Sequence, residues 1–124
     1  MIGIDLIKIS RVENFIERFS DKALQKFLNQ NEILLIKNAS TAAGFWAAKE
    51  ATSKALQTGI GKSCGFHDIE IYKLANGAPA LKLHKRIIEQ FSITDTSLSI
   101  THDAGFAIAV VAIESTTANK VKQL

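Results

Sequence analysis

The sequence predicts a single α+β domain in which an antiparallel sheet packs against one long helix. The chain has 124 residues, the size of one domain, and its 47% of apolar residues suffice to form one core. Apolar residues alternate near both ends of the chain and recur at helical spacing between them. The predicted order is a strand, helices, a hairpin, a short helix and a final hairpin, which is typical of the α+β class. We expect the domain to cover residues 1–114 and a polar tail to follow over 115–124.

The first element is predicted to be a strand over residues 1–9. Ile2, Ile4 and Leu6 alternate with smaller or polar residues, so we expect them to form its buried face. Asp5 would then lie on the opposite face.

Helical spacing of apolar residues predicts helices over 11–19 and within 20–38. Ser10 and Glu13 have the spacing of a capping box at the start of the first of these helices. A break is expected near Asn29, where a second cap spacing occurs.

The longest helix is predicted over residues 41–57. Ser40 or Thr41 supplies a hydroxyl where the helix should begin. Gly59 stands where a left-handed residue is expected to end it.

The second half of the chain is predicted to contain two hairpins separated by a short helix. The first hairpin would join strands near 69–72 and 80–83 through a turn at 76–79, where the sequence is Asn-Gly-Ala-Pro. A short helix should follow over 84–91.

The final hairpin is predicted to join strands over 97–101 and 106–114 through a turn at 103–105. The last strand is apolar at successive positions, so we expect it to lie at the centre of the sheet.

Charge and cysteine content exclude several classes of protein. The net charge of +3 suggests an anionic partner, but the few aromatic residues are not interleaved with the basic ones as a base-stacking surface requires. Nucleic-acid binding is therefore the weaker alternative.

No apolar run approaches the roughly 20 residues that span a bilayer, and no secretory signal is visible. The lone Cys64 cannot form an internal disulfide. We expect a cytoplasmic protein without a membrane partner.

Two polar patterns are candidates for a functional site. Trp46, Glu50 and Lys54 recur every four residues and so share one face of the long helix, where Glu50 and Lys54 could also form an ordinary surface ion pair. Hydroxyl residues followed by His102 precede the final strand and could hold a phosphate, or simply form a strand edge.

Other patterns carry less weight. The glycines after the long helix do not match a phosphate-binding fingerprint. Cys64 is followed by His67 and Asp68, but nucleophile, base and orienting group rarely come from one short loop.

Several motifs together resemble the holo-acyl-carrier-protein synthases, the short bacterial type of 4′-phosphopantetheinyl transferase, over residues 1–114. The motifs occur in the same order as in that family: Gly3-Ile4-Asp5-Leu6 with Arg11, Trp46-Ala47-Ala48-Lys49-Glu50-Ala51 with Lys54, Gly59-Ile60-Gly61, Asn76-Gly77-Ala78-Pro79 and Ser99-Ile100-Thr101-His102. The Lys-Glu-Ala helix is the most specific of them.

The resemblance implies an enzyme of fatty acid biosynthesis that transfers 4′-phosphopantetheine from coenzyme A to a serine of apo acyl carrier protein and releases adenosine 3′,5′-bisphosphate. It implies Mg²⁺ held by Asp5 and Glu50. Two carboxylates suffice for Mg²⁺ once substrate phosphates complete its ligands. The base that deprotonates the serine stays open between a metal-bound water, Glu50 and Lys49.

The resemblance also implies binding residues and an assembly. Coenzyme A would contact Lys54, Gly59, Gly61, Asn76, Gly77, Pro79, Thr101 and His102. The acidic carrier protein would contact Arg11, with Lys8, Arg18, Lys22 and Lys26 as neighbours. The family forms trimers with active sites between subunits, which agrees with a mean hydropathy of +0.11, high for so small a chain.

Two positions depart from the family. Phe45 stands where many members have an arginine that contacts phosphate, and Lys26 and Asn29 stand where many have an arginine and a threonine. A binding module of the same fold without chemistry is the main alternative, but it would be favoured by the loss of Asp5 or Glu50, and both are present.

Overall fold

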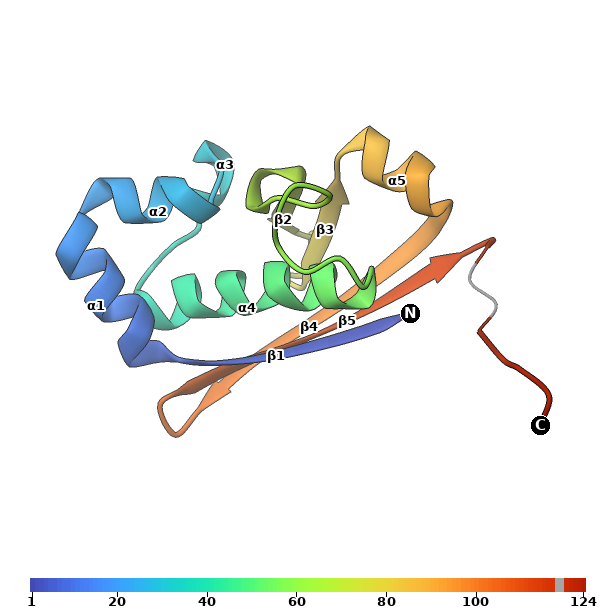
Figure 1. Cartoon of the computed structure of the whole chain (residues 1–124). Helices are drawn as coiled ribbons and strands as arrows, with labels where there is room; N and C mark the ends of the chain where they lie inside the picture. Colours follow the sequence, from blue (N-terminus) through green and yellow to red (C-terminus); the bar gives the residue numbers. More distant parts are fainter. Residues whose placement is uncertain (118–119) are drawn as a thin grey trace.

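The computed structural model describes residues 1–117 and 120–124 and confirms a single α+β domain (Figure 1). Its elements, in chain order, are β1 (Ile2–Lys8), α1 (Ile9–Phe19), α2 (Asp21–Phe27), α3 (Gln30–Ile33), α4 (Ala39–Ala55), the 3₁₀ turn η1 (Phe66–Asp68), β2 (Ile69–Lys73), β3 (Pro79–Leu83), α5 (Lys85–Phe91), β4 (Ile93–Asp103) and β5 (Phe106–Ser115). No helix among these described residues is long and apolar enough to cross a membrane.

The main sheet has three antiparallel strands in the order β1-β5-β4, and α4 lies across one of its faces (Figure 1). The predicted central position of the last strand is thus confirmed. Strand β1 approaches α4 very closely at Gly3, where an added Cβ would lie 1.8 Å from the carbonyl oxygen of Ala51. Only glycine allows this distance between strand and helix.

The predicted orientation of β1 is wrong. Ile2, Ile4 and Leu6 point away from α4 and are 73%, 59% and 57% exposed, whereas Gly3 and Ile7 are buried on the helix side. The close approach at Gly3 requires this orientation, because a side chain at positions 2 or 4 would not fit between strand and helix. Asp5 therefore lies on the same side of the sheet as α4.

The face of the sheet opposite α4 is open, and its β1 and β5 part is apolar. Val110 of β5 is exposed there, and it pairs in register with Ile4 on one side and Ser99 on the other. Among the described residues, no helix or strand covers this face (Figure 1).

Strands β2 and β3 form the predicted hairpin as a separate two-stranded sheet beside β4. Gly77 in its turn has a φ of +86°. The second hairpin turns through Ala104 and Gly105, both with positive φ, as a two-residue turn requires. Strand β4 is longer than the predicted 97–101 and begins at Ile93.

The helical boundaries differ from the expected caps. Helix α1 begins at Ile9 behind Lys8, and Ser10 lies inside it, so the predicted Ser10–Glu13 capping box is wrong. The break near Asn29 is confirmed, because α2 ends at Phe27 and the carboxylate of Glu32 accepts the Asn29 N–H at 2.8 Å.

Helix α4 begins two residues before the predicted start and ends two residues earlier than predicted. The Asn38 side chain, rather than Ser40 or Thr41, accepts the Thr41 N–H. At the other end Gln57, not Gly59, is the first left-handed residue, with a φ of +63°. The N–H groups of Gln57 and Thr58 donate to the carbonyls of Lys54 and Ser53, which is the Schellman arrangement.

The tail predicted over 115–124 starts one residue later than predicted, because Ser115 still belongs to β5. Residues 118–119 of that predicted tail lie outside the described residues. Residues 120–124 form no helix or strand.

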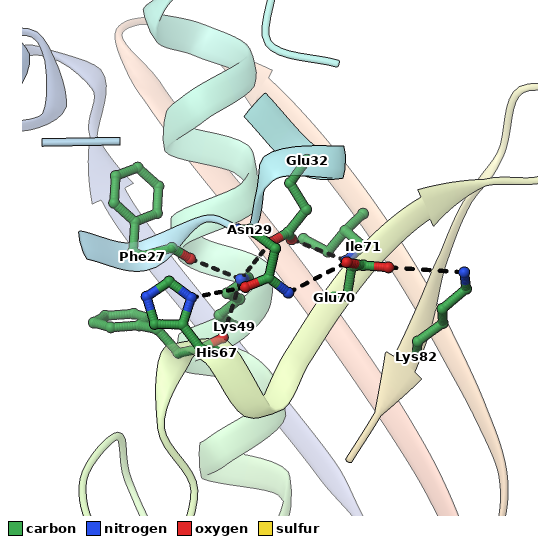
Figure 2. Close-up of polar contacts among 9 residues, drawn as sticks. Phe27, Asn29, Glu32, Lys49, His67, Glu70, Ile71 and Lys82 are labelled. Atoms are coloured by element: carbon green, nitrogen blue, oxygen red, sulfur yellow. Dashed lines mark hydrogen bonds and ion pairs between the residues drawn. The ribbon is translucent and has the colours of Figure 1, made fainter. Parts of the chain in front are cut away.

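A buried ion pair ties α4 to the helices and the hairpin above it (Figure 2). The Lys49 ammonium is fully buried and donates to the carboxylate of Glu32 and the carbonyl of Phe27, both at 2.7 Å, and to the carbonyl of Phe66 at 3.0 Å. The second oxygen of Glu32 accepts the N–H of Ile71 at 2.9 Å. The ammonium therefore connects α4 directly with α2, α3 and η1, and Glu32 extends the connection to β2.

Lys49→Met should destabilise the fold by about 3 to 5 kcal/mol, because it leaves the Glu32 carboxylate buried without a countercharge. The double variant Lys49→Met, Glu32→Gln should lose less than the single variant, since no buried charge is left unpaired. Urea unfolding of the three proteins measures this difference. A Lys49→Met protein as stable as the unsubstituted chain would contradict it.

Candidate active site

Side chains of β1, α1 and α4 converge on one pocket at the β1 edge of the sheet. We call it the carboxylate pocket; its lining residues are Asp5, Leu6, Ile7, Arg11, Trp46, Glu50 and Lys54. The predicted helical stripe of Trp46, Glu50 and Lys54 is thus on the side of α4 that faces Asp5.

Trp46 forms the inner end of this stripe and fixes its orientation. Its ring packs against Phe27 and Phe66, with centroids 4.9 Å away in each case, and against Phe15 at 6.0 Å. These contacts hold α4 against α1 and η1, so the next turns of the stripe point outward into the pocket.

An ion pair crosses the carboxylate pocket from helix to strand. The Lys54 ammonium donates to Asp5 Oδ1 at 2.8 Å and to the carbonyl of Ile4 at 3.2 Å. Partial burial, followed by the negative charge of Asp5, raises the pKa of Glu50, while Lys54 and Arg11 act in the opposite direction. Asp5 and Glu50 are therefore close enough to repel one another.

The carboxylate pocket has the donor chemistry that a magnesium ion requires. Mg²⁺ is usually bound through one or two carboxylates, together with substrate phosphates and waters. Asp5 and Glu50 supply two carboxylates, and their mutual repulsion would be relieved by a divalent cation. The described residues contain no cluster of three or more potential ligands, so a metal here would need oxygen atoms from a substrate.

Lys49 lies next to Glu50 in the chain but does not reach the carboxylate pocket. Its ammonium is directed into the interior, where three acceptors already occupy it (Figure 2). Burial also lowers its pKa, although Glu32 counteracts this effect. The structure therefore corrects the expectation that Lys49 could be the base: of the two side-chain candidates, only Glu50 faces the pocket.

A second pocket lies at the opposite, β4 edge of the sheet, and we call it the β4-edge pocket. Its lining residues are Ser40, Thr41, Gly44, Phe45, Lys73, Pro79, Ile100 and His102. It brings together Pro79 and His102, which the sequence motifs singled out. Lys73, Ser40 and Thr41 were not anticipated as site residues, because no local pattern marks them.

Phe45 takes no part in polar contacts in the β4-edge pocket. Its side chain is buried, and the ammonium of Lys73 lies 6.0 Å from the centre of its ring. The cation of this pocket therefore comes from the end of β2 rather than from position 45.

The other predicted coenzyme A residues lie outside both pockets. Thr101 alternates with Ile100 and His102 and so lies on the open face of the sheet. Asn76 and Gly77 form the β2–β3 turn, where the Asn76 side chain accepts the N–H of Ala78.

Gly59 and Gly61 lie in the loop after α4. A Cβ at Gly59, Gly61 or Gly77 would meet no atom within 4 Å, so the backbone at these positions is open to a ligand.

The basic residues predicted to bind a carrier protein are all exposed, on or beside α1 and α2. Arg18 and Lys26 lie against the Phe19 ring, at 5.2 and 4.7 Å from its centre. Lys8 and Lys22 are exposed on the same part of the chain, whereas Arg11 also lines the carboxylate pocket.

Cys64 is unsuited to nucleophilic catalysis, as its sequence context suggested. It is fully buried, and desolvation raises its pKa to about 11. Its chain neighbours face other partners: His67 bonds Asn29, and Asp68 pairs with Arg86.

Comparison with known proteins gives one consistent result. Residues 1–111 match the 4′-phosphopantetheinyl transferase superfamily. The chain is 60% identical to a holo-acyl-carrier-protein synthase of Sulfurimonas denitrificans, over 98% of this chain and all of that protein.

Solved structures agree with this result. The Helicobacter pylori holo-acyl-carrier-protein synthase in complex with coenzyme A superposes with a TM-score of 0.89 at 50% identity, over 92% of this chain and all of that one. The Bacillus anthracis holo-acyl-carrier-protein synthase in complex with CoA (3′,5′-ADP) gives 0.77 at 36% identity, over 93% and 96% of the two chains.

In the metal-free protein, Glu50 should titrate above the ordinary glutamate pKa of 4.5. Asp5→Asn should lower that pKa, because it removes a neighbouring negative charge. Carbon-detected NMR of the side-chain carboxyl measures both values.

The raised pKa of Glu50 also makes the stability of the fold depend on pH. Because the folded state binds this proton more tightly than the unfolded chain, the contribution of Glu50 to stability is lost as the pH rises through its raised pKa. We compare the free energy of unfolding of Glu50→Gln with that of the unsubstituted protein. The difference in favour of the variant should be larger at pH 7 than at pH 4. A Glu50 pKa unchanged in Asp5→Asn would show that the two carboxylates do not interact.

Proposed function

Because the chain belongs to the 4′-phosphopantetheinyl transferase superfamily and is a holo-acyl-carrier-protein synthase type of enzyme, we propose that its carboxylate pocket is the active site. We propose that the transfer there depends on Mg²⁺. The proposed reaction moves 4′-phosphopantetheine from coenzyme A to a serine of apo acyl carrier protein in fatty acid biosynthesis. The observation that supports it is the convergence of Asp5, Glu50 and Lys54 on one pocket. When bound there, Mg²⁺ would neutralise the charge of the diphosphate and polarise it.

The residues of the pocket have separate roles in this proposal. Asp5 and Glu50 hold the metal, and Lys54 balances the charge of the diphosphate as a mobile point charge. The serine oxygen forms a bond to the β-phosphorus, and the bond from that phosphorus to the oxygen of the adenosine 3′,5′-bisphosphate leaving group breaks. The serine proton must leave as well, and Glu50 is the side-chain candidate for the base that faces this pocket.

The nucleotide end of coenzyme A is proposed to occupy the β4-edge pocket. His102 and Pro79 line that pocket, and Lys73 supplies a cation beside hydroxyls of Ser40 and Thr41. Asn76 and Gly77 adjoin it through the β2–β3 turn, and we retain Thr101, Gly59 and Gly61 as further contacts of the same substrate.

The two pockets belong to one active site only if neighbouring subunits share it. They share no lining residue, and they lie at opposite edges of the sheet, on the β1 and β4 sides of β5. A head-to-tail arrangement of copies would bring the β1 edge of one to the β4 edge of the next and can close into a ring. The open apolar face of the sheet is the surface that such a ring would bury, and we propose a homotrimer.

The acidic carrier protein is proposed to dock beside the carboxylate pocket. Arg11 lines the pocket itself, and Lys8, Arg18, Lys22 and Lys26 extend the positive charge over α1 and α2. Such charges act mainly on the encounter rate and weaken with salt.

The direct test is the intact mass of a verified apo acyl carrier protein after incubation with this protein, coenzyme A and Mg²⁺. We expect a gain of one phosphopantetheine that a chelator abolishes. Asp5→Ala and Glu50→Ala should each lower the rate by at least about 100-fold while the fold persists, because each removes a metal ligand.

The outcomes separate the alternatives. A carrier protein whose mass does not change, with coenzyme A still bound, would favour a binding module without chemistry. Full activity of the double variant Asp5→Ala, Glu50→Ala would exclude the proposed metal site.

Val110→Glu should dissociate the trimer, because it places a charge at the centre of the open apolar face. Gln90→Glu adds the same charge at an exposed position of α5, which lies on the α4 side of the sheet (Figure 1), and is the matched control. Light scattering coupled to size-exclusion chromatography should give a trimer for the control and a monomer for Val110→Glu. Activity should fall with the monomer, and a Val110→Glu protein that is still trimeric would refute the assigned interface.

A further inference from the structure

Lys54 forms an ion pair with Asp5 across the carboxylate pocket. Its ammonium bonds Asp5 Oδ1 at 2.8 Å, and the same ammonium bonds the carbonyl of Ile4, so its position between helix and strand is defined by two acceptors. The Asp5 side chain is only 14% exposed, whereas that of Lys54 is 52% exposed and can move into solvent.

The pocket needs a countercharge at this position. Asp5 and Glu50 place two carboxylates in the same pocket, and Lys54 is the cation that directly contacts Asp5. Arg11 lines the same pocket, but no ion pair joins it to Asp5.

We propose that Lys54 is an internal placeholder for the divalent cation at Asp5, and that its release couples metal binding to diphosphate binding. This inference rests on the proposed function and adds a second role for Lys54. Metal alone must displace the ammonium from Asp5 and leaves it without an anionic partner. When the diphosphate arrives as well, the displaced ammonium gains a new partner, so each ligand strengthens the binding of the other.

The coupling has a distinctive chemical requirement. A ligand must carry the diphosphate to promote metal binding through Lys54. Adenosine 3′,5′-bisphosphate lacks the diphosphate and should not take Lys54 from Asp5.

The experiment measures the binding of Mn²⁺, as a probe for Mg²⁺, to the full chain by electron paramagnetic resonance of the free ion. Each protein is titrated alone, with coenzyme A and with adenosine 3′,5′-bisphosphate. In the unsubstituted protein, coenzyme A should tighten Mn²⁺ binding and the bisphosphate should not.

Lys54→Met should tighten Mn²⁺ binding in the absence of other ligands by about fivefold, the worth of one partly exposed ion pair. The enhancement by coenzyme A should shrink in the same variant. Arg11→Met is the matched control, because it removes an equal charge from the same pocket without breaking an ion pair to Asp5, and it should change Mn²⁺ affinity by at most about twofold. Lys54→Arg keeps the charge and should bind Mn²⁺ as weakly as the unsubstituted protein does.

The results distinguish failure of the inference from failure of the proposed function. If Lys54→Met binds Mn²⁺ no more tightly, or if Arg11→Met gains as much, the placeholder role is overturned and the proposed transfer still stands. If the unsubstituted protein binds no Mn²⁺ even with coenzyme A, or if Asp5→Asn does not weaken binding, the metal site itself is overturned and the inference falls with it.

Discussion

The arrangement of this fold depends on one buried ammonium. Lys49 reaches from α4 into the interior and satisfies acceptors on α2, α3 and η1 (Figure 2). An unpaired charge at that depth would cost several kcal/mol, so these segments can pack only where their oxygens meet the ammonium. These contacts and the packing of Trp46 together set the rotation of α4 about its axis. Glu50, one residue further along, is thereby directed toward the carboxylate pocket.

Lys49 and Glu50, although adjacent on α4, thus point in different directions. Lys49 holds the layers of the domain together, and Glu50 meets Asp5 at the edge of the sheet. The close approach of Gly3 to Ala51 brings β1 near enough for Lys54 to bond Asp5. The chemistry proposed for this pocket therefore rests on packing constraints at residues that do not line it.

Sequence patterns predicted the helices and strands more accurately than they predicted which face of each is buried. The hairpins, the long helix and the central last strand were correct because turn residues and apolar runs act locally. The buried face of β1 was wrong, because Ile2, Ile4 and Leu6 have the pattern of a core face although the domain leaves them open. Alternation identifies an apolar face but does not say whether the same chain or another one covers it.

The sequence by itself determined the family, the stripe of Trp46, Glu50 and Lys54, and Asp5 as its counterpart, since motif order and helical spacing are local properties. Only the tertiary structure decided that Lys49 is interior, that Lys73 joins His102, and that the two pockets lie at opposite edges of the sheet. These facts depend on contacts between segments far apart in the chain. No spacing within one segment encodes which of two adjacent charged side chains finds a buried partner.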